Sequence, residues 1–183
     1  MRQKLAEQFG TSTKTVDLEL EKRIASVRLD YEECQNMLKL IKQLAAQTTN
    51  VVQAQTSIST CFERMTRSNT PLHSEFTVGQ NLFDIMANSA LIVVSSLTTF
   101  ADELAGLIKR EYEPLWPLLR RYDSLRLDYD VCRLELESTR TSNVPRSNVA
   151  ELKFIESQAN FTAIGNDVSI RLAHIEKIGR AHV

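Results

Sequence analysis

The chain has 183 residues, 43% of them hydrophobic and 25% charged, which is enough for one domain with a hydrophobic core. A formal net charge of −1 excludes the strong basic field on which nucleic-acid binding usually depends. Five glycines and four prolines are few, which favours long helices over a sheet with many turns. The three cysteines are widely spaced and odd in number, so we expect buried thiols in a reducing compartment.

The first predicted helix begins near Thr13 or Thr15, either of which is a suitable N-cap. Apolar residues then recur in alternating steps of three and four, which predicts coiled-coil packing. The members of this repeat are Leu20, Ile24, Val27, Tyr31, Cys34, Leu38, Ile41, Ala45, Thr48, Val52, Gln55, Ile58, Phe62 and Met65. Residues 47–60 carry no charge, so we expect them to be buried on more than one side.

A turn at residues 68–71 leads into the second predicted helix, between Phe76 and Ser138. Its apolar repeat is Val93, Leu97, Phe100, Leu104, Leu107, Leu115, Leu118, Tyr122, Leu125, Tyr129, Cys132 and Leu136. Pro114 and Pro117 lie inside this stretch, and each removes a backbone donor. We predict a kink near residues 112–117, because the repeat keeps its phase there; a break into two helices is the alternative.

Residues 85–101 carry no charge, which raises the question of a membrane span. The run is shorter than the roughly 20 residues that a span requires, and it contains several serine, threonine and asparagine residues. We therefore expect a helix that is buried by protein on several sides. One hairpin cannot supply enough covering surface for this. This reasoning predicts a second chain, with Val93, Leu97, Phe100 and Leu104 as the candidate dimer seam.

A second turn at residues 139–148 precedes the third predicted helix. Its apolar residues are Leu152, Ile155, Ala159 and Thr162, followed by Ile164, Val168, Leu172 and Ile175. The fold class is therefore all-α, with three long antiparallel helices, the second one kinked, in a coiled-coil bundle. Residues 178–183 read like a translated sequencing adapter, so we expect a domain over 1–177 whose third helix is incomplete.

Catalytic and metal-binding patterns are not found in the sequence. His73, His174 and His182 do not have metal-ligand spacing from other ligand residues, and no phosphate loop or nucleophile motif occurs. We therefore expect no enzyme activity, no metal and no cofactor.

The clearest charge pattern is a set of acids and arginines in steps of three and four near the end of the second helix. Its members are Asp123, Arg126, Asp130, Arg133, Glu137 and Arg140. An intrahelical ladder of ion pairs is expected, because each arginine has acids on both sides; an arginine stripe facing anionic lipid is the alternative. The candidate membrane-binding residues are Arg120, Arg121, Arg140, Arg146 and Lys153, and such a surface binds modestly and in a salt-sensitive way.

Three stretches of the sequence resemble the arfaptin-homology domain, a branch of the BAR superfamily. Residues 13–21 (TKTVDLELE) resemble the opening of its first helix. Residues 125–130 (LRLDYD), with Arg133 and residues 136–137, resemble the end of its second helix, and residues 166–172 (NDVSIRL) resemble its third. The first motif is the most specific, and the order and spacing agree across nearly the whole chain.

The resemblance implies a crescent-shaped homodimer that binds GTP-loaded small GTPases of the Arf-like or Rac class. It also implies a cytoplasmic protein that is peripheral on curved Golgi or vesicle membranes with anionic, phosphoinositide-containing lipid. Pro114 and Pro117 depart from the pattern expected of the family, as does the short segment before the domain. Two alternatives stay open, a purely structural coiled-coil module without GTPase or lipid binding, and a lipid-binding module that acts without a GTPase.

Overall fold

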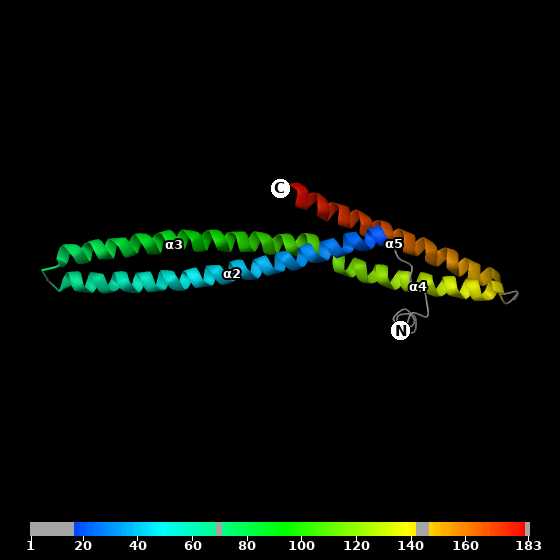
Figure 1. Ribbon diagram of the computed structural model, residues 1–183, viewed down its shortest axis with the longest axis horizontal. Coiled ribbons are helices and arrows are strands. Elements are labelled where there is room, and N and C mark those ends of the chain that lie inside the picture. The colour runs from blue at the N-terminus through cyan, green and yellow to red at the C-terminus, as the bar shows by residue number, and fades with distance from the viewer. Residues whose placement is uncertain (1–16, 69–70, 142–146, 182–183) are drawn as a thin grey trace. The chain divides into compact units, whose positions relative to one another are not determined.

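The computed structural model describes residues 17–68, 71–141 and 147–181, and throughout these ranges the regular structure is helical, with no strand. Figure 1 shows the helices α2 (Leu18–Arg67), α3 (His73–Leu107), α4 (Leu115–Thr141) and α5 (Ser147–Ala181), with the π-helix η1 (Ile108–Tyr112) after α3. The all-α class with three long helices is confirmed, and the second predicted helix is divided into α3 and α4.

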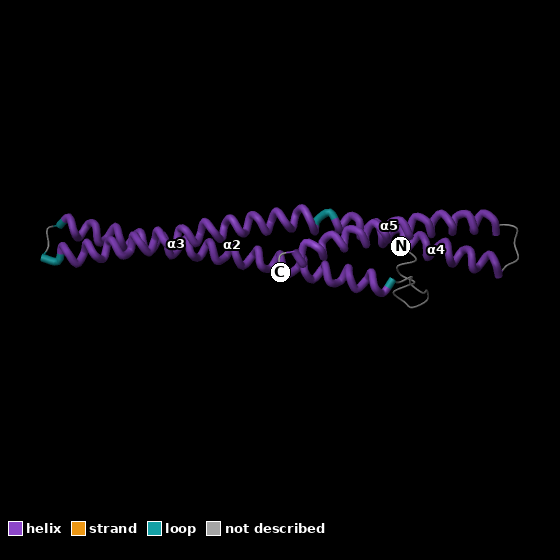
Figure 2. Tube along the Cα trace, turned by 90° about the horizontal axis from the view of Figure 1, so that it is seen from above, coloured by secondary structure: helices purple, strands orange, loops and turns teal. Residues whose placement is uncertain are grey.

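The chain forms two compact units. One consists of the start of α2, through Tyr31, together with the chain from Lys109 onward, and we name it the α4–α5 unit. The other consists of residues 32–108, and we name it the α2–α3 unit. Figures 1 and 2 show α2 and α3 side by side as an antiparallel hairpin, and α4 and α5 likewise.

In the α2–α3 unit, α2 packs along the predicted repeat from Cys34 to Gln55. Beyond that point Ser59 is packed in place of the predicted Ile58, because an α-helix with 3.6 residues per turn drifts away from a 3.5-residue repeat, whereas Phe62 is packed as predicted. Ser59 is 5% exposed, whereas Ile58 is 40% exposed. The Ser59 hydroxyl donates a hydrogen bond of 2.5 Å to the Asp84 carboxylate of α3, so the buried polar group is satisfied.

The packed line of α3 includes the predicted Leu97 and Leu104 but differs from the prediction by one residue at Val93 and Phe100. Ala87 and Ala101 are buried, whereas Val93 and Phe100 are about half exposed, at 49% and 48%. The prediction followed the large apolar residues, but alanines allow the two helices of the hairpin to approach closely.

Close approach is clearest at Gly79, near the turn of the hairpin. A Cβ atom added there would lie 3.0 Å from the Phe62 ring of α2. That ring also packs against Phe83 and Phe76, with ring centroids 5.9 and 6.1 Å apart. Gly79 therefore provides space for an aromatic cluster that joins α2 to α3.

The α4–α5 unit has the largest buried core of the described chain. Its buried residues are Leu20, Ile24, Val27, Leu115, Leu119, Tyr122, Ile164, Val168, Leu172 and Ile175. The predicted second line of the third helix is thus confirmed as core, but Leu152 and Ile155 of the first line are 68% and 55% exposed. The first half of α5 instead contacts α4 through aromatic rings, Tyr129 against Phe154 and Phe161 at 5.5 and 5.4 Å between ring centroids.

The proline segment is a break in the α-helical pattern, the alternative that the sequence left open. After η1 a turn at residues 113–114 precedes α4. Pro114 has no N–H with which to pair the carbonyl of Arg110, as an α-helix would require. Arg171 of α5 takes this role: its Nη2 donates to the carbonyl oxygens of Arg110 at 2.8 Å and Glu111 at 2.7 Å. The ring of Trp116 then packs edge-on against Tyr31, at 4.9 Å.

Candidate functional site

The α2–α3 unit carries a second apolar repeat on α2, parallel to the packed one and exposed along its whole length. We name it the outer seam. Its residues follow steps of three and four, each preceding a packed position by one: Met37, Leu40, Leu44, Gln47, Val51, Ala54, Ile58, Cys61 and Met65. Such a heptad repeat is the pattern with which one helix of a coiled coil packs against another. The sequence already contained it, but the uncharged run drew attention only to residues 47–60.

Helix α3 has an exposed apolar face of its own, which we name the α3 outer face. It consists of Val78, Leu82, Ile85, Met86, Ile92, Val93 and Phe100. Met86, Val93 and Phe100 each precede a packed residue by one, as the outer seam does on α2. Two antiparallel helices are related by a two-fold axis perpendicular to the plane that contains both of them. Equivalent positions on the two helices therefore lie on the same face of the hairpin. The outer seam and these three residues therefore share a side.

Several of the hydroxyl groups beside these faces are hydrogen-bonded to their own helices. On α3, Ser96 donates to the carbonyl of Ile92, four residues earlier, at 3.0 Å. Thr98 and Thr99 likewise donate to the carbonyls of the residues four positions before them. On α2, Thr48 donates to the carbonyl of Leu44 at 2.9 Å. These groups need no partner from outside, so a second apolar surface can cover the faces with little desolvation cost.

One helical stretch of the described chain, within His73–Thr139, is apolar and long enough to cross a membrane on length and composition alone. Only 17% of its most apolar window is buried. A single stretch of this kind is weak evidence for a span, because core helices of soluble proteins pass the same test. It does show how much apolar surface of α3 is left uncovered.

The predicted dimer seam divides between two environments. Leu104 is 8% exposed and Leu97 is half-buried, so both belong to the packing of α3 against α2. Val93 and Phe100 lie on the α3 outer face and are available to a partner. As a partner surface, the four residues stay a prediction.

The candidate membrane residues are only partly brought together. Arg120, Arg121 and Lys153 are exposed on α4 and α5. The contact of Tyr129 with Phe154 sets the register of the two helices and separates Lys153 from Arg120 by about 2.8 helical turns. The side chain of Arg140 and the whole of Arg146 lie outside the described residues.

Within the predicted ladder on α4, Arg126, Asp130 and Arg133 form an ion-pair cluster, as expected, but Arg126 and Asp130 are buried. Asp130 accepts from Arg126 at 3.1 Å and from Arg133 at 3.2 Å. Asp130 is 0% exposed and Arg126 is 4% exposed. The lipid-facing alternative does not fit these two residues. Spacing alone could have revealed the burial, because both lie in phase with the core residue Tyr122.

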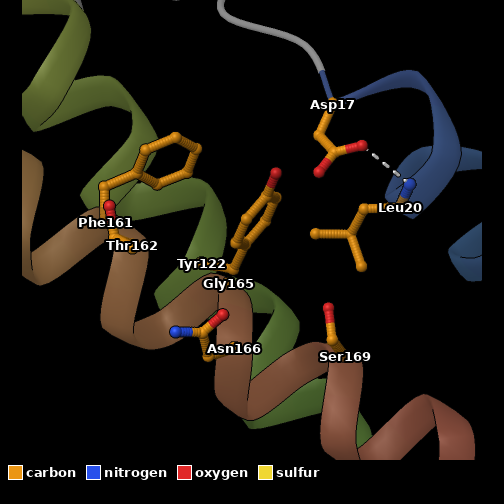
Figure 3. A pocket seen from close by; sticks show the side chains of 8 residues that line it. All are labelled: Asp17, Leu20, Tyr122, Phe161, Thr162, Gly165, Asn166 and Ser169. Carbon is orange, nitrogen blue, oxygen red and sulfur yellow. Dashed lines mark hydrogen bonds between the residues drawn. The ribbon is translucent and has the colours of Figure 1, made fainter.

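A pocket of about 240 Å³ opens between the start of α2 and the α4–α5 hairpin (Figure 3). Asp17 and Leu20 lie on one side of it, Tyr122 at its base, and Phe161 and Asn166 on α5. The Tyr122 side chain is buried, and burial together with the nearby carboxylates of Glu21 and Asp17 raises its pKa to about 12. Among the described residues, its hydroxyl has no hydrogen-bond partner. The sequence analysis placed Tyr122 in an apolar repeat and gave no sign of a pocket.

Metal chemistry finds no support in the described part of the chain, where no group of three or more His, Cys, Asp or Glu residues is arranged to hold an ion. Cys34 and Cys132 are half-buried and form no disulfide among the described residues, whereas Cys61 is exposed on the outer seam. His174 contacts the Glu111 carboxylate at 3.1 Å. The expectation of buried thiols is therefore wrong for Cys61, since the line on which it lies is the uncovered one.

Comparisons with known proteins agree with the helical arrangement. The arfaptin-like domain matches residues 1–175. Arfaptin-1 of Homo sapiens is 25% identical over 181 residues, which are 96% of this chain and 48% of that protein. Arfaptin-2 of Homo sapiens is 26% identical over 183 residues, which are 96% of this chain and 53% of that protein. The chain thus spans about half the length of the curated relatives it matches. With the match covering nearly every residue of an all-α chain, the protein belongs to the arfaptin-like domain family.

Proposed function

We propose that the protein is a non-enzymatic, dimerising scaffold that binds a GTP-loaded small GTPase of the Arf-like or Rac class on curved membrane. Cytoplasmic location, peripheral on Golgi or vesicle membranes, is part of the proposal. The observation that carries it is the family match over residues 1–175. Dimerisation has a separate support in the exposed apolar repeat of the α2–α3 unit.

A second copy of the chain is the partner that suits the outer seam and the α3 outer face. Both surfaces are heptad-like, uncharged in their central parts and served by hydroxyl groups that need no external partner. Apolar patches of this length on one side of a hairpin are typical of protein interfaces. A small GTPase would then bind a dimer.

Membrane binding by the basic residues is expected to be weak. Arg120, Arg121 and Lys153 offer roughly 1 kcal/mol each near an anionic surface, and Asp123 and Asp128 lie on the same helix as the arginines. A weak lipid surface agrees with a scaffold whose recruitment depends on a membrane-bound partner.

The test is co-sedimentation of the full chain with liposomes containing phosphoinositide, with and without a panel of Arf-like and Rac-type GTPases. Recruitment by the GTP-locked but not the GDP-locked form supports the proposal. Strong, salt-sensitive binding without any GTPase would instead support a lipid-only module, and no binding at all would leave a structural coiled-coil module. Arg120→Glu with Arg121→Glu should weaken the lipid-dependent part, and Lys39→Glu with Lys42→Glu serves as the charge-matched control.

The dimer is tested by light scattering of the full chain and of single charge insertions. Val51→Asp on the outer seam and Val93→Asp on the α3 outer face should each lower the molar mass toward that of a monomer, because the new charge would be desolvated. Gln53→Asp, exposed on α2 but off the seam, should leave the mass unchanged. An unchanged mass in both seam variants would contradict the proposed interface.

A further inference from the structure

The pocket beside Tyr122 has features that neither the dimer nor the membrane surface uses. Its base is a phenol that is only 2% exposed and whose hydroxyl has no hydrogen-bond partner among the described residues. Figure 3 shows this hydroxyl directed toward Asp17. A buried polar group normally has a partner, so the pocket is arranged to receive one.

One carboxylate oxygen of Asp17 is hydrogen-bonded to the backbone of α2, and the other is directed to the pocket. Its Oδ1 accepts the N–H groups of Glu19 and Leu20, both at 3.1 Å, and so caps the N-terminus of α2. Figure 3 shows the second oxygen on the side of the Tyr122 hydroxyl. Two oxygen atoms from different helices therefore face the same space.

The charges around the pocket favour a cation. The carboxylates of Asp17, Glu21 and Asp123 all act on the Tyr122 hydroxyl, and the opposing cation is Arg126, which is paired with Asp130 at 3.1 Å. On the far side, Arg23 is neutralised by Glu176 at 2.8 Å. The carboxylates nearest the Tyr122 hydroxyl therefore favour a cation there.

The walls of the pocket suit an aliphatic stem. Leu20 and Phe161 lie on either side of Tyr122, and the Phe161 ring packs on the Tyr122 ring with centroids 5.3 Å apart. Asn166 and Ser169 add polar groups on the α5 side. Lysine and arginine side chains combine an apolar stem with a cationic head in this way.

We propose that this pocket receives a basic side chain from a partner polypeptide. The ammonium or guanidinium head donates to the Asp17 carboxylate and the Tyr122 hydroxyl oxygen, and the stem packs between Leu20 and Phe161. The site is independent of the GTPase and membrane binding proposed above. It is an additional recognition point on the α4–α5 unit.

The probes for this site are the Nα-acetyl N-methylamides of lysine, arginine and norleucine, titrated into the full chain while amide NMR shifts are recorded. The basic probes should shift the amides of Leu20, Gly165 and Asn166, with weak affinity, on the order of millimolar. The norleucine probe, which has the stem without the charge, should bind at least about tenfold more weakly, because it cannot form the charge-assisted hydrogen bonds.

Two variants separate the contributions of the head-group contacts. Asp17→Asn keeps a good helix cap but removes the charge, and it should weaken the basic probes about tenfold. Tyr122→Phe keeps the ring and should weaken them about threefold or more. Asp128→Asn, an exposed acid elsewhere on α4, is the control and should have no effect.

Three results would overturn the proposal. Equal binding of the norleucine probe would make the site a plain apolar pocket, and no localised shifts with any probe would make it a water-filled one. Unchanged affinity in a folded Asp17→Asn protein, judged by an intact α5 amide spectrum, would show that the Asp17 charge does not bind the cationic head of the probe. Each of these outcomes is separable from the co-sedimentation result, which does not involve the pocket.

Discussion

The buried ion cluster of α4 makes a sharp prediction for Asp130→Asn. The Asp130 carboxylate is 0% exposed and accepts from Arg126 at 3.1 Å and Arg133 at 3.2 Å. The asparagine has nearly the same shape but lacks the charge. Arg126, itself 4% exposed, would then lose the buried carboxylate with which it pairs.

The expected cost is large because the charge that remains cannot return to water without unfolding the helix packing around it. Removing one partner of a buried pair typically costs about 3–5 kcal/mol of unfolding free energy. Taking about 3 kcal/mol and a urea m-value of about 2 kcal/mol/M, the midpoint of urea unfolding should fall by roughly 1.5 M. Arg133 is more exposed than Arg126 and can lean toward solvent, so the lower end of the range is expected.

Fluorescence of Trp116 is the appropriate probe, because it is the single tryptophan of the chain and lies in the same unit as Asp130. Asp128→Asn, on the exposed side of the same helix, is the matched control and should change the midpoint little. Replacing both buried partners, Arg126→Met with Asp130→Leu, should recover most of the stability, since no buried charge then lacks its partner and Arg133, whose side chain is 24% exposed, can turn toward solvent. A midpoint for Asp130→Asn that equals the Asp128→Asn midpoint would refute this reasoning.

Other predictions concern packing, the proline break and alkaline pH. Gly79→Ala should lower the unfolding free energy by about 1–3 kcal/mol, because the added Cβ meets the Phe62 ring at 3.0 Å; calorimetry showing no loss would mean that the ring moves freely. Arg171→Met should speed amide hydrogen exchange in residues 108–116 by leaving backbone carbonyls unpaired, whereas the exposed Lys177→Met should not. Burial raises the pKa of Tyr122 to about 12, so the stability due to its neutral phenol is full below pH 10 and lost as the pH rises toward 12. Absorbance titration should show a late-ionising tyrosine that Tyr122→Phe lacks.

The long helices could be predicted because one property, the three-and-four spacing of apolar residues, determines them. The same spacing placed Val168 and Leu172 in the core correctly. It predicted burial one residue too early at Ile58 and Phe100, because the buried residues are Ser59 and Ala101. Drift of the repeat and close helix approach favour small residues over large ones there. Residue size was therefore a poorer guide to burial than position.

The interactions that join distant parts of the chain could not be read from local patterns. Pro114 signals a missing donor, but the compensating Arg171 lies 61 residues from the carbonyl of Arg110 that it binds. Likewise, the pocket beside Tyr122 requires residues from α2, α4 and α5, which only the folded chain brings together. The burial of Asp130, in contrast, could have been inferred from its phase with Tyr122.

The hydroxyl groups that turn back onto their own helices on α2 and α3 determine how any assembly through these faces would respond to its surroundings. Contacts made there are held by dispersion and by the release of water, neither of which ions screen at moderate concentration. Attraction between exposed arginines and anionic lipid, in contrast, weakens steadily as salt is added. Varying the ionic strength therefore distinguishes self-association of the chain from its recruitment to a lipid surface, without any substitution.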